Sequence, residues 1–143
     1  MRLFSKDRRM LFLCSVLFVF VACSGTGTGG AGTTKTVRVI LGHLRFAPAA
    51  LTVKTGTTVH FLLQNSDAID HEFVLGSDEV QQQHERMRMN GEHMMEGVGM
   101  MAIAAGKTMD LTYTFSTPGR LIYGCHVDDH YAQGMRGVVT VTE

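Results

Sequence analysis

The chain has 143 residues, of which 45% are hydrophobic and 18% charged, a length and composition typical of one globular domain. Thirteen basic and thirteen acidic side chains balance to a net charge of zero with neutral histidines. No basic excess of the kind that nucleic-acid binding requires is present, and this class of function is excluded.

The first 22 residues have the composition of a secretory leader. The basic start "MRLFSKDRRM" precedes "LFLCSVLFVFVA", an apolar run too short to span a bilayer comfortably. Ala22 and Cys23 end this run and resemble the processing site of a bacterial lipoprotein, in which Cys23 would become the lipidated first residue. An ordinary signal peptide cleaved nearby and an uncleaved anchor remain alternatives. In each case the domain is exported, and the lipoprotein resemblance implies attachment to the periplasmic face of a bacterial membrane, with a soluble periplasmic form as the alternative.

Removal of residues 1–22 takes away four basic side chains, one acidic side chain and Cys14, which leaves a net charge of −3. Residues 23–34 are rich in Gly, Ser and Thr and are expected to form a flexible tether. The folded domain is predicted to cover 35–143, with Cys125 as its only thiol. Because disulfides form freely outside the cytoplasm, an unpaired thiol there is either buried and inert or bound to a metal.

Beyond the tether, hydrophobic residues recur with the period of two that predicts β-strands. Gly, Pro, Asn and Asp separate the segments. Short strands at this spacing indicate an all-β sandwich or barrel. The predicted strands are "TVRVIL", "LTVK", "TTVHFLLQN", "HEFVLG", "MDLTYTF", "GRLIYGC" and "GVVTVTE".

One segment, residues 78–101, interrupts this pattern and is interpreted as an insertion between two strands. Its first part is rich in Gln, Glu, Arg and Met, which favour helix, and Asn90-Gly91 ends that composition. A short helix over about 79–89 is therefore predicted, followed by a looser second half.

A soft set of potential metal ligands lies near the C-terminus in "YGCHVDDHYAQGM". Cys125, His130 and Met135 are separated by four residues each, a spacing that fits one loop between two strands. Thiolate, imidazole and thioether donors suit copper. A trigonal copper site needs a second histidine, and His71 is the best candidate because it begins a predicted strand. His126 should point to the opposite face from Cys125, since neighbouring side chains alternate along an extended backbone.

The segments "FAPAALTVKTGTTVHFLLQN", "HEFVLG" and "YGCHVDDHYAQGMRGVVTV" resemble the cupredoxins, the small blue copper proteins related to plastocyanin, azurin and auracyanin. The resemblance runs from about residue 36 to 142. It implies a Greek-key β-sandwich with one type 1 copper held by His71, Cys125, His130 and Met135. Zinc is the alternative metal. A binuclear copper centre is not expected, because Asp129 occupies the position of the second cysteine.

The expected site has four protein ligands and no open position for a substrate, so the protein is predicted not to be an enzyme. Two functions remain. The insertion resembles that of the periplasmic copper-tolerance branch of cupredoxins, which favours copper handling with one-electron redox capability. The alternative is an electron carrier, since in the family the histidine in the position of His130 reaches the surface where a redox partner docks. The protein is expected to be a monomer, with no nucleic-acid partner and no membrane contact beyond a lipid anchor.

Thioether-rich side chains of the insertion could form a second, Cu(I) site, since methionine is a suitable ligand for Cu(I). The alternative is that they pack as an apolar lid. The candidate ligands are His84, Met87, Met89, His93, Met94 and Met95, and Met100 and Met101 belong to the same methionine-rich segment.

Overall fold

The computed structural model describes residues 32–91 and 99–143, which belong to one compact unit. The predicted signal, Cys23 and most of the tether lie outside the described residues, as do His93, Met94 and Met95 of the insertion. In the part that is described, no helix is long and apolar enough to cross a membrane.

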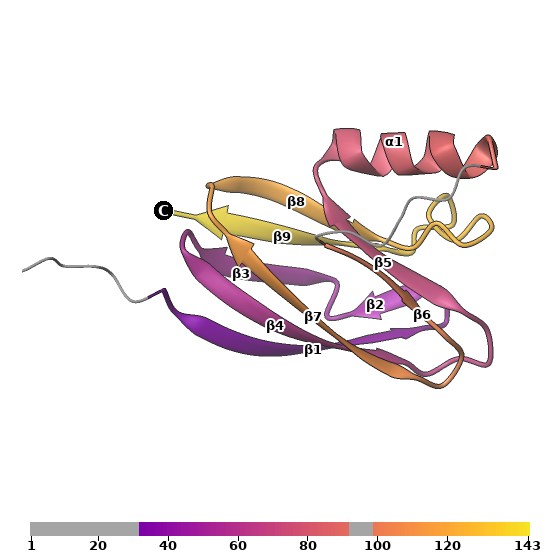
Figure 1. Ribbon diagram of the computed structural model, residues 1–143, viewed down its shortest axis with the longest axis horizontal. Coiled ribbons are helices and arrows are strands. Elements are labelled where there is room, and N and C mark those ends of the chain that lie inside the picture. The colour runs from indigo at the N-terminus through magenta and orange to yellow at the C-terminus, as the bar shows by residue number, and fades with distance from the viewer. Residues whose placement is uncertain (1–31, 92–98) are drawn as a thin grey trace, which may run out of the picture. The chain divides into compact units, whose positions relative to one another are not determined.

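Two β-sheets face each other and form the predicted sandwich (Figure 1). The first sheet has the order β2-β1-β4-β7, and the second has the order β3-β9-β8-β5-β6. The pairs β1·β4 and β3·β9 are parallel, and the other pairs are antiparallel. The strands of the first sheet are β1 (Thr34–Gly42), β2 (Arg45–Ala47), β4 (Thr57–Asn65) and β7 (Thr108–Phe115), and those of the second are β3 (Ala50–Lys54), β5 (His71–Gly76), β6 (Met100–Ile103), β8 (Gly119–Gly124) and β9 (Arg136–Thr142).

Alternation of side chains accounts for the core between the sheets. Along β4 every second residue is buried, as the period of two predicts. Phe61 from the first sheet lies against Phe73 from the second, with ring centroids 5.3 Å apart. Phe73 in turn stacks on Tyr123 at 5.3 Å, and the Tyr123 hydroxyl donates a 2.6 Å hydrogen bond to the carbonyl of Pro48.

Helix α1 (Asp78–Met89) confirms the predicted helix and lies against β5 and β8 (Figure 1). Ser77 caps its N-terminus by accepting a hydrogen bond from the Val80 N–H, and Asn90 caps its C-terminus. Gly91 follows with φ of 71°, a left-handed conformation that glycine adopts readily. The buried residues of α1 are polar, Gln81 and His84, and their hydrogen bonds help to attach this helix to the sheet.

The insertion ends earlier than predicted. Strand β6 begins at Met100, and Met100 and Met101 pair with Val74 and Phe73 of β5. These two methionines are therefore part of the second sheet. Met100 and Met101 were assigned to the insertion because they continue its methionine-rich composition.

Candidate metal centre

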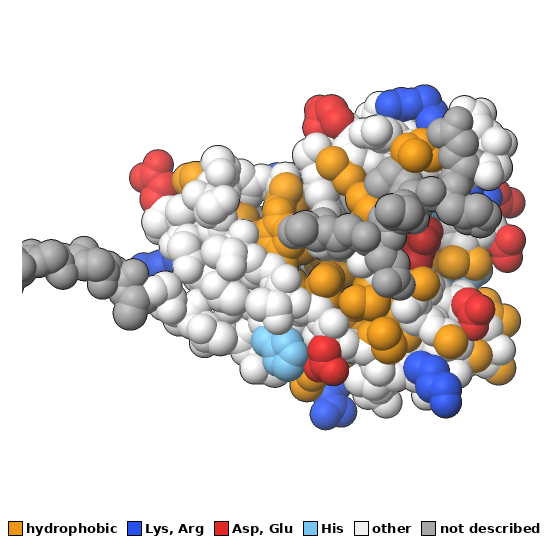
Figure 2. Space-filling view, in the orientation of Figure 1, with side chains coloured by type: hydrophobic (Ala, Val, Ile, Leu, Met, Phe, Trp, Pro, Cys, Tyr) orange, Lys and Arg blue, Asp and Glu red, His pale blue; other side chains and the backbone are white. Residues whose placement is uncertain are grey.

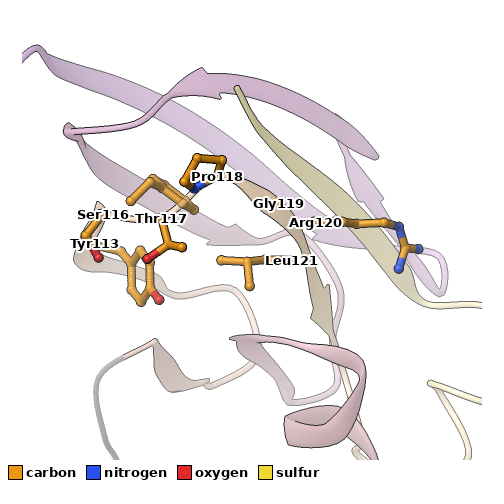
Figure 3. A pocket seen from close by; sticks show the side chains of 8 residues that line it. Tyr113, Ser116, Thr117, Pro118, Gly119, Arg120 and Leu121 are labelled. Carbon is orange, nitrogen blue, oxygen red and sulfur yellow. The ribbon is translucent and has the colours of Figure 1, made fainter. Parts of the chain in front are cut away.

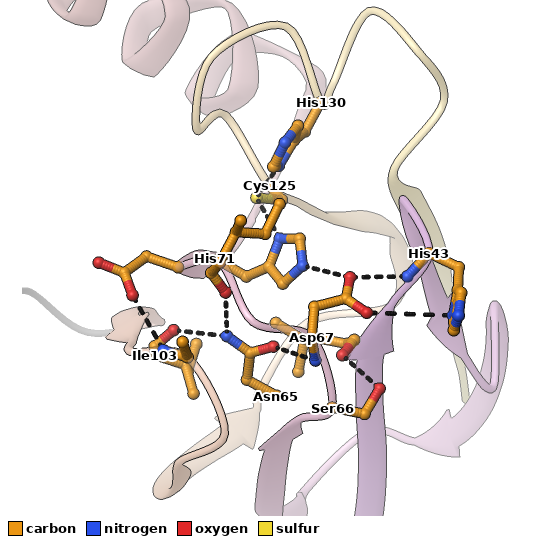
Figure 4. Close-up of polar contacts among 12 residues, drawn as sticks. His43, Asn65, Ser66, Asp67, His71, Ile103, Cys125 and His130 are labelled. Atoms are coloured by element: carbon orange, nitrogen blue, oxygen red, sulfur yellow. Dashed lines mark hydrogen bonds and ion pairs between the residues drawn. The ribbon is translucent and has the colours of Figure 1, made fainter.

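Three metal-binding side chains meet at one end of the sandwich (Figure 4). His71 is the first residue of β5, Cys125 follows the last residue of β8, and His130 lies in the loop that leads to β9. Cys125 Sγ is 3.6 Å from Nδ1 of His71 and 3.4 Å from Nδ1 of His130. All three side chains are buried, so the centre excludes bulk water.

These distances fit a single trigonal metal ion. Bonds of about 2.0 Å to nitrogen and about 2.3 Å to sulfur, 120° apart, would place the sulfur about 3.7 Å from each nitrogen. The sulfur–nitrogen separations agree with that value to within a few tenths of an ångström. Two imidazoles and one thiolate in a trigonal set are the equatorial ligands of a blue copper site.

The orientation of His71 is fixed by a carboxylate on its far side (Figure 4). Its Nε2–H donates a 3.0 Å hydrogen bond to Oδ2 of Asp67, which leaves the lone pair of Nδ1 directed at the metal position. This bond from His71 holds the pKa of Asp67 below its ordinary value, and the backbone N–H of His43 donates a further 2.8 Å bond to the same carboxylate. A carboxylate in this position raises the basicity of a histidine ligand and fixes its tautomer.

Asn65 at the end of β4 organises the turn that carries Asp67. Its side-chain amide donates to the carbonyls of Ile69 and Ile103, at 2.7 and 3.0 Å, and its Oδ1 accepts the N–H of Asp67 at 3.0 Å. The turn between β4 and β5 is thereby attached to β6, and His71 enters β5 at a defined position.

The loop from Cys125 to Met135 is closed by its own backbone. The Cys125 N–H donates to the carbonyl of Met135 at 3.1 Å, and the Met135 N–H donates to the carbonyl of His130 at 2.9 Å. Gly134 has φ of 95°, which a residue with a side chain would adopt only with strain. The Met135 side chain is fully buried, and its role as axial ligand remains a prediction.

The Cys125 sulfur is protonated at neutral pH in the metal-free protein, because burial raises the pKa of the thiol to about 11. The Glu72 N–H donates a hydrogen bond to Sγ at 3.4 Å, and backbone hydrogen bonds from Glu72 and Val127 partly offset the effect of burial on the thiol pKa. A metal ion that binds here must displace the thiol proton, as coordinated thiols are deprotonated.

The sequence pattern of copper-binding proteins of the plastocyanin/azurin family matches residues 33–142. The chain belongs to the plastocyanin/azurin family. The copper-resistant cuproprotein CopI of Rubrivivax gelatinosus is 34% identical over 113 residues, which cover 78% of this chain and 68% of that protein. CopI of Pseudomonas aeruginosa is 30% identical over 147 residues, with coverage of 82% and 81%. A solved structure of auracyanin B superposes with a TM-score of 0.63 at 27% identity and covers 76% of this chain and 89% of that chain.

Membership of the plastocyanin/azurin family identifies copper as the cofactor, and the cluster of His71, Cys125 and His130 is compatible with a type 1 copper site. This is the only cluster of three or more His, Cys, Asp or Glu donors within residues 32–91 and 99–143. The prediction that His126 points away from the thiol is confirmed, since both of its ring nitrogens contact side chains of α1.

Within the described residues of this plastocyanin/azurin-family protein, the predicted Cu(I) ligands of the insertion do not come together as a metal site. His84 is buried and its Nε2–H donates to Oε1 of Glu72 at 3.2 Å, whereas Met87 is half-buried and Met89 is 68% exposed. His93, Met94 and Met95 are outside the described residues. A second Cu(I) site therefore remains a prediction.

Two further features of this plastocyanin/azurin-family protein lie on its surface: the distribution of charge and a pocket. On the face shown in Figure 2, acidic and basic side chains are scattered singly, with no basic patch. A pocket of about 260 Å³ lies at the turn between β7 and β8, where Tyr113, Pro118 and Leu121 line it (Figure 3). Its lining holds no His, Cys or Met and lies at the other end of β8 from Cys125, so it takes no part in the copper centre.

Some contacts around the centre were not predicted from the sequence. Asp67 and Glu72 lie close to His71 in the chain, but their roles depend on the fold. A carboxylate four residues before a histidine ligand was the one available signal for Asp67.

Proposed function

We propose that the protein binds one copper ion at His71, Cys125 and His130, with Met135 as the axial ligand, and acts in periplasmic copper tolerance. The observation that carries this proposal is the buried trigonal donor set in a chain related to copper-resistant cuproproteins. Two of those relatives match over about four fifths of this chain. Attachment to the membrane through a lipid on Cys23 belongs to the same proposal.

The residues of the centre suit retention of copper rather than turnover of a substrate. Bound copper supplies one-electron chemistry between its +1 and +2 states. His71 is fixed by Asp67, and Cys125 receives the Glu72 N–H, so the donor atoms are held in place on both sides. Met135 would complete a set of four protein ligands and would leave no open coordination site, which supports a role other than that of an enzyme.

Electron transfer is the second candidate. Similarity to auracyanin B favours it, and His130 is 6% exposed, whereas His71 and Cys125 are 1% and 0% exposed. A redox partner protein would then dock near His130. In this proposal the copper-tolerance role has the stronger support, because several copper-resistance relatives match the chain.

The test combines spectroscopy with growth. Purified protein loaded with Cu(II) should bind one copper and show an intense thiolate-to-copper absorption band, and Cys125→Ser should abolish the band while far-ultraviolet circular dichroism stays unchanged. Deletion of the gene should then reduce growth in excess copper and leave electron-transport rates unchanged. A deletion strain with normal copper tolerance and impaired electron transport would favour the carrier. Zinc in place of copper, or a retained band in Cys125→Ser, would contradict the site itself.

A further inference from the structure

The residues that follow two of the copper ligands stack on each other. His126 follows Cys125 and Tyr131 follows His130, and their ring centroids are 4.3 Å apart with an interplanar angle of 10°. His126 is fully buried and Tyr131 is half-buried. Because each ring belongs to the neighbour of a ligand, this stack fixes the backbone of Cys125 relative to that of His130.

Helix α1 holds the imidazole of this stack. The ring nitrogens of His126 lie 2.8 Å from Oε2 of Glu85 and 2.8 Å from Oε1 of Gln81. Gln81 is itself fully buried, and its Nε2 donates to the carbonyls of Val74 and Ile122, at 2.8 and 3.0 Å. These carbonyls belong to β5 and β8, the strands that lead from His71 and into Cys125. The ring of His126 is therefore positioned by α1 and by both ligand-bearing strands.

The backbone around Cys125 is restrained by the same group of residues. The Glu72 carboxylate accepts the His126 N–H at 2.8 Å, while the Glu72 N–H donates to Cys125 Sγ at 3.4 Å. A side chain at position 124 would not fit, because a Cβ on Gly124 would lie 2.6 Å from the ring of Tyr131 and 2.9 Å from Oε1 of Gln81. Tyr131 of the stack and Gln81 of α1 therefore lie directly against the backbone of β8 at Gly124, the residue before Cys125.

We propose that His126, Tyr131 and Gln81 are positioning residues of the copper centre, through which α1 holds Cys125 and His130 at their metal-binding separation before copper binds. This inference rests on the copper site of the proposed function. Donor atoms held at trigonal separations would disfavour the tetragonal arrangement that Cu(II) adopts with nitrogen and oxygen ligands, and pre-organisation lowers the cost of binding. Loosening the stack should therefore weaken Cu(I) binding more than Cu(II) binding.

The stack is tested in the full copper-loaded chain with two variants of one residue. Tyr131→Phe keeps the aromatic face, whereas Tyr131→Leu removes it. We expect Tyr131→Leu to retain an absorption band, since the ligands are intact, but to lower the ratio of Cu(I) to Cu(II) affinity by about tenfold, a fall in reduction potential of about 59 mV for one electron. Tyr131→Phe should keep the wild-type ratio and band position.

The helix contact is tested in the same way with Gln81→Leu and with Gln82→Leu, its exposed neighbour on α1. Gln81→Leu should reproduce the effect of Tyr131→Leu, and Gln82→Leu should have none. Equal affinity ratios in wild type, Tyr131→Leu and Gln81→Leu would overturn the positioning role, as would a Tyr131→Leu protein that fails to fold without metal while Tyr131→Phe folds. Absence of copper binding in the wild-type protein would instead contradict the proposed function.

Discussion

His126 and His130 lie in one loop, but only His130 faces the thiol. Nδ1 of His130 is 3.4 Å from Cys125 Sγ, whereas the ring of His126 contacts Gln81 and Glu85. The difference follows from the extended backbone after β8, where neighbouring side chains point to opposite faces. At the scale of single residues, the two imidazoles therefore serve the centre in different ways.

We expect His130→Ala to open the centre to solvent and to remove most of the intense visible band and the electron exchange of the bound copper. His126→Ala should keep an intense band, because all the predicted ligands remain. Visible absorption and electron self-exchange of the two copper-loaded variants measure this difference. A band that disappears in His126→Ala and persists in His130→Ala would show that the ligand assignment in the loop is wrong.

Cys125 also predicts an alkaline loss of stability in the metal-free protein. Burial raises the pKa of its thiol to about 11, and an unfolded chain titrates near 8.5. Between these values the folded state retains a proton that the unfolded chain has lost, so the free energy of unfolding must fall as the pH rises.

Urea unfolding between about pH 8 and about pH 11 measures this effect, and wild type should lose about 3 kcal/mol more than Cys125→Ser. Tyr123, whose pKa burial raises to about 12, titrates in both proteins and cancels in the difference. Parallel pH profiles for the two proteins would mean that burial does not raise the pKa of the thiol in the metal-free fold.

The candidate copper ligands could be predicted from the sequence because their donor atoms and their order along the chain are typical of a copper site. His71, Cys125 and His130 come together as predicted. Asp67 and Glu72 were not predicted, because carboxylates are common in turns and strands. Their roles arise only when β5 pairs with β8 and the turn between β4 and β5 folds back against His71.

At the scale of secondary structure, α1 places polar residues against the sheet and leaves its described methionines more exposed. Gln81 and His84 are buried, whereas Met87 is half-buried and Met89 is 68% exposed. An apolar lid would show the reverse arrangement. The exposure of Met89 and the partial exposure of Met87 argue against a lid, and Cu(I) binding by these methionines remains a prediction.

Replacing Met87, Met89, Met94 and Met95 together by leucine keeps most of the apolar volume and removes the soft sulfur donors. We expect the visible band to survive, while Cu(I) uptake beyond one equivalent and growth of the host in excess copper decrease. Met109→Leu is a matched control, because Met109 is an exposed methionine on β7. Unchanged Cu(I) uptake and copper tolerance in the fourfold variant would return the insertion to a packing role.

Strands and the helix were predicted correctly from the sequence where each was long enough to show its hydrophobic period. Strand β4 alternates along its whole length, and the helix ends at the Asn90-Gly91 pair that predicted its end. Strand β2 was missed because three residues are too few to show alternation. Strand β6 was missed because the hydrophobic run at Met100 looks like a continuation of the methionine-rich insertion.

At the scale of the whole molecule, aromatic side chains join the two sheets. Phe61 is fully buried and contacts Phe73 of the second sheet and Phe115 of its own. Because Phe73 then stacks on Tyr123, a continuous aromatic core runs from β4 to β8, the strand that leads into Cys125. Packing between the sheets thus supports the strand that carries the thiol.

Phe61→Ala should lower the free energy of unfolding of the metal-free protein by about 3 to 5 kcal/mol, because it leaves a cavity between the sheets. Leu62→Ala is the matched control, since Leu62 is the next residue of β4 and is only half-buried on the outer face. Its loss should be about 1 kcal/mol. Equal losses in urea unfolding would mean that the aromatic core does not carry the contact between the sheets.

The position of β9 in the second sheet has a consequence for when the protein can fold during its synthesis. Strand β9 follows all the other strands in the chain but lies between β3 and β8, and its parallel pairing with β3 joins residues far apart in sequence. Until β9 has left the ribosome, β3 has no neighbour and the loop from Cys125 to Met135 has no closing strand. Pairings of such long range form slowly, so the loop that carries His130 and Met135 is closed only late in folding.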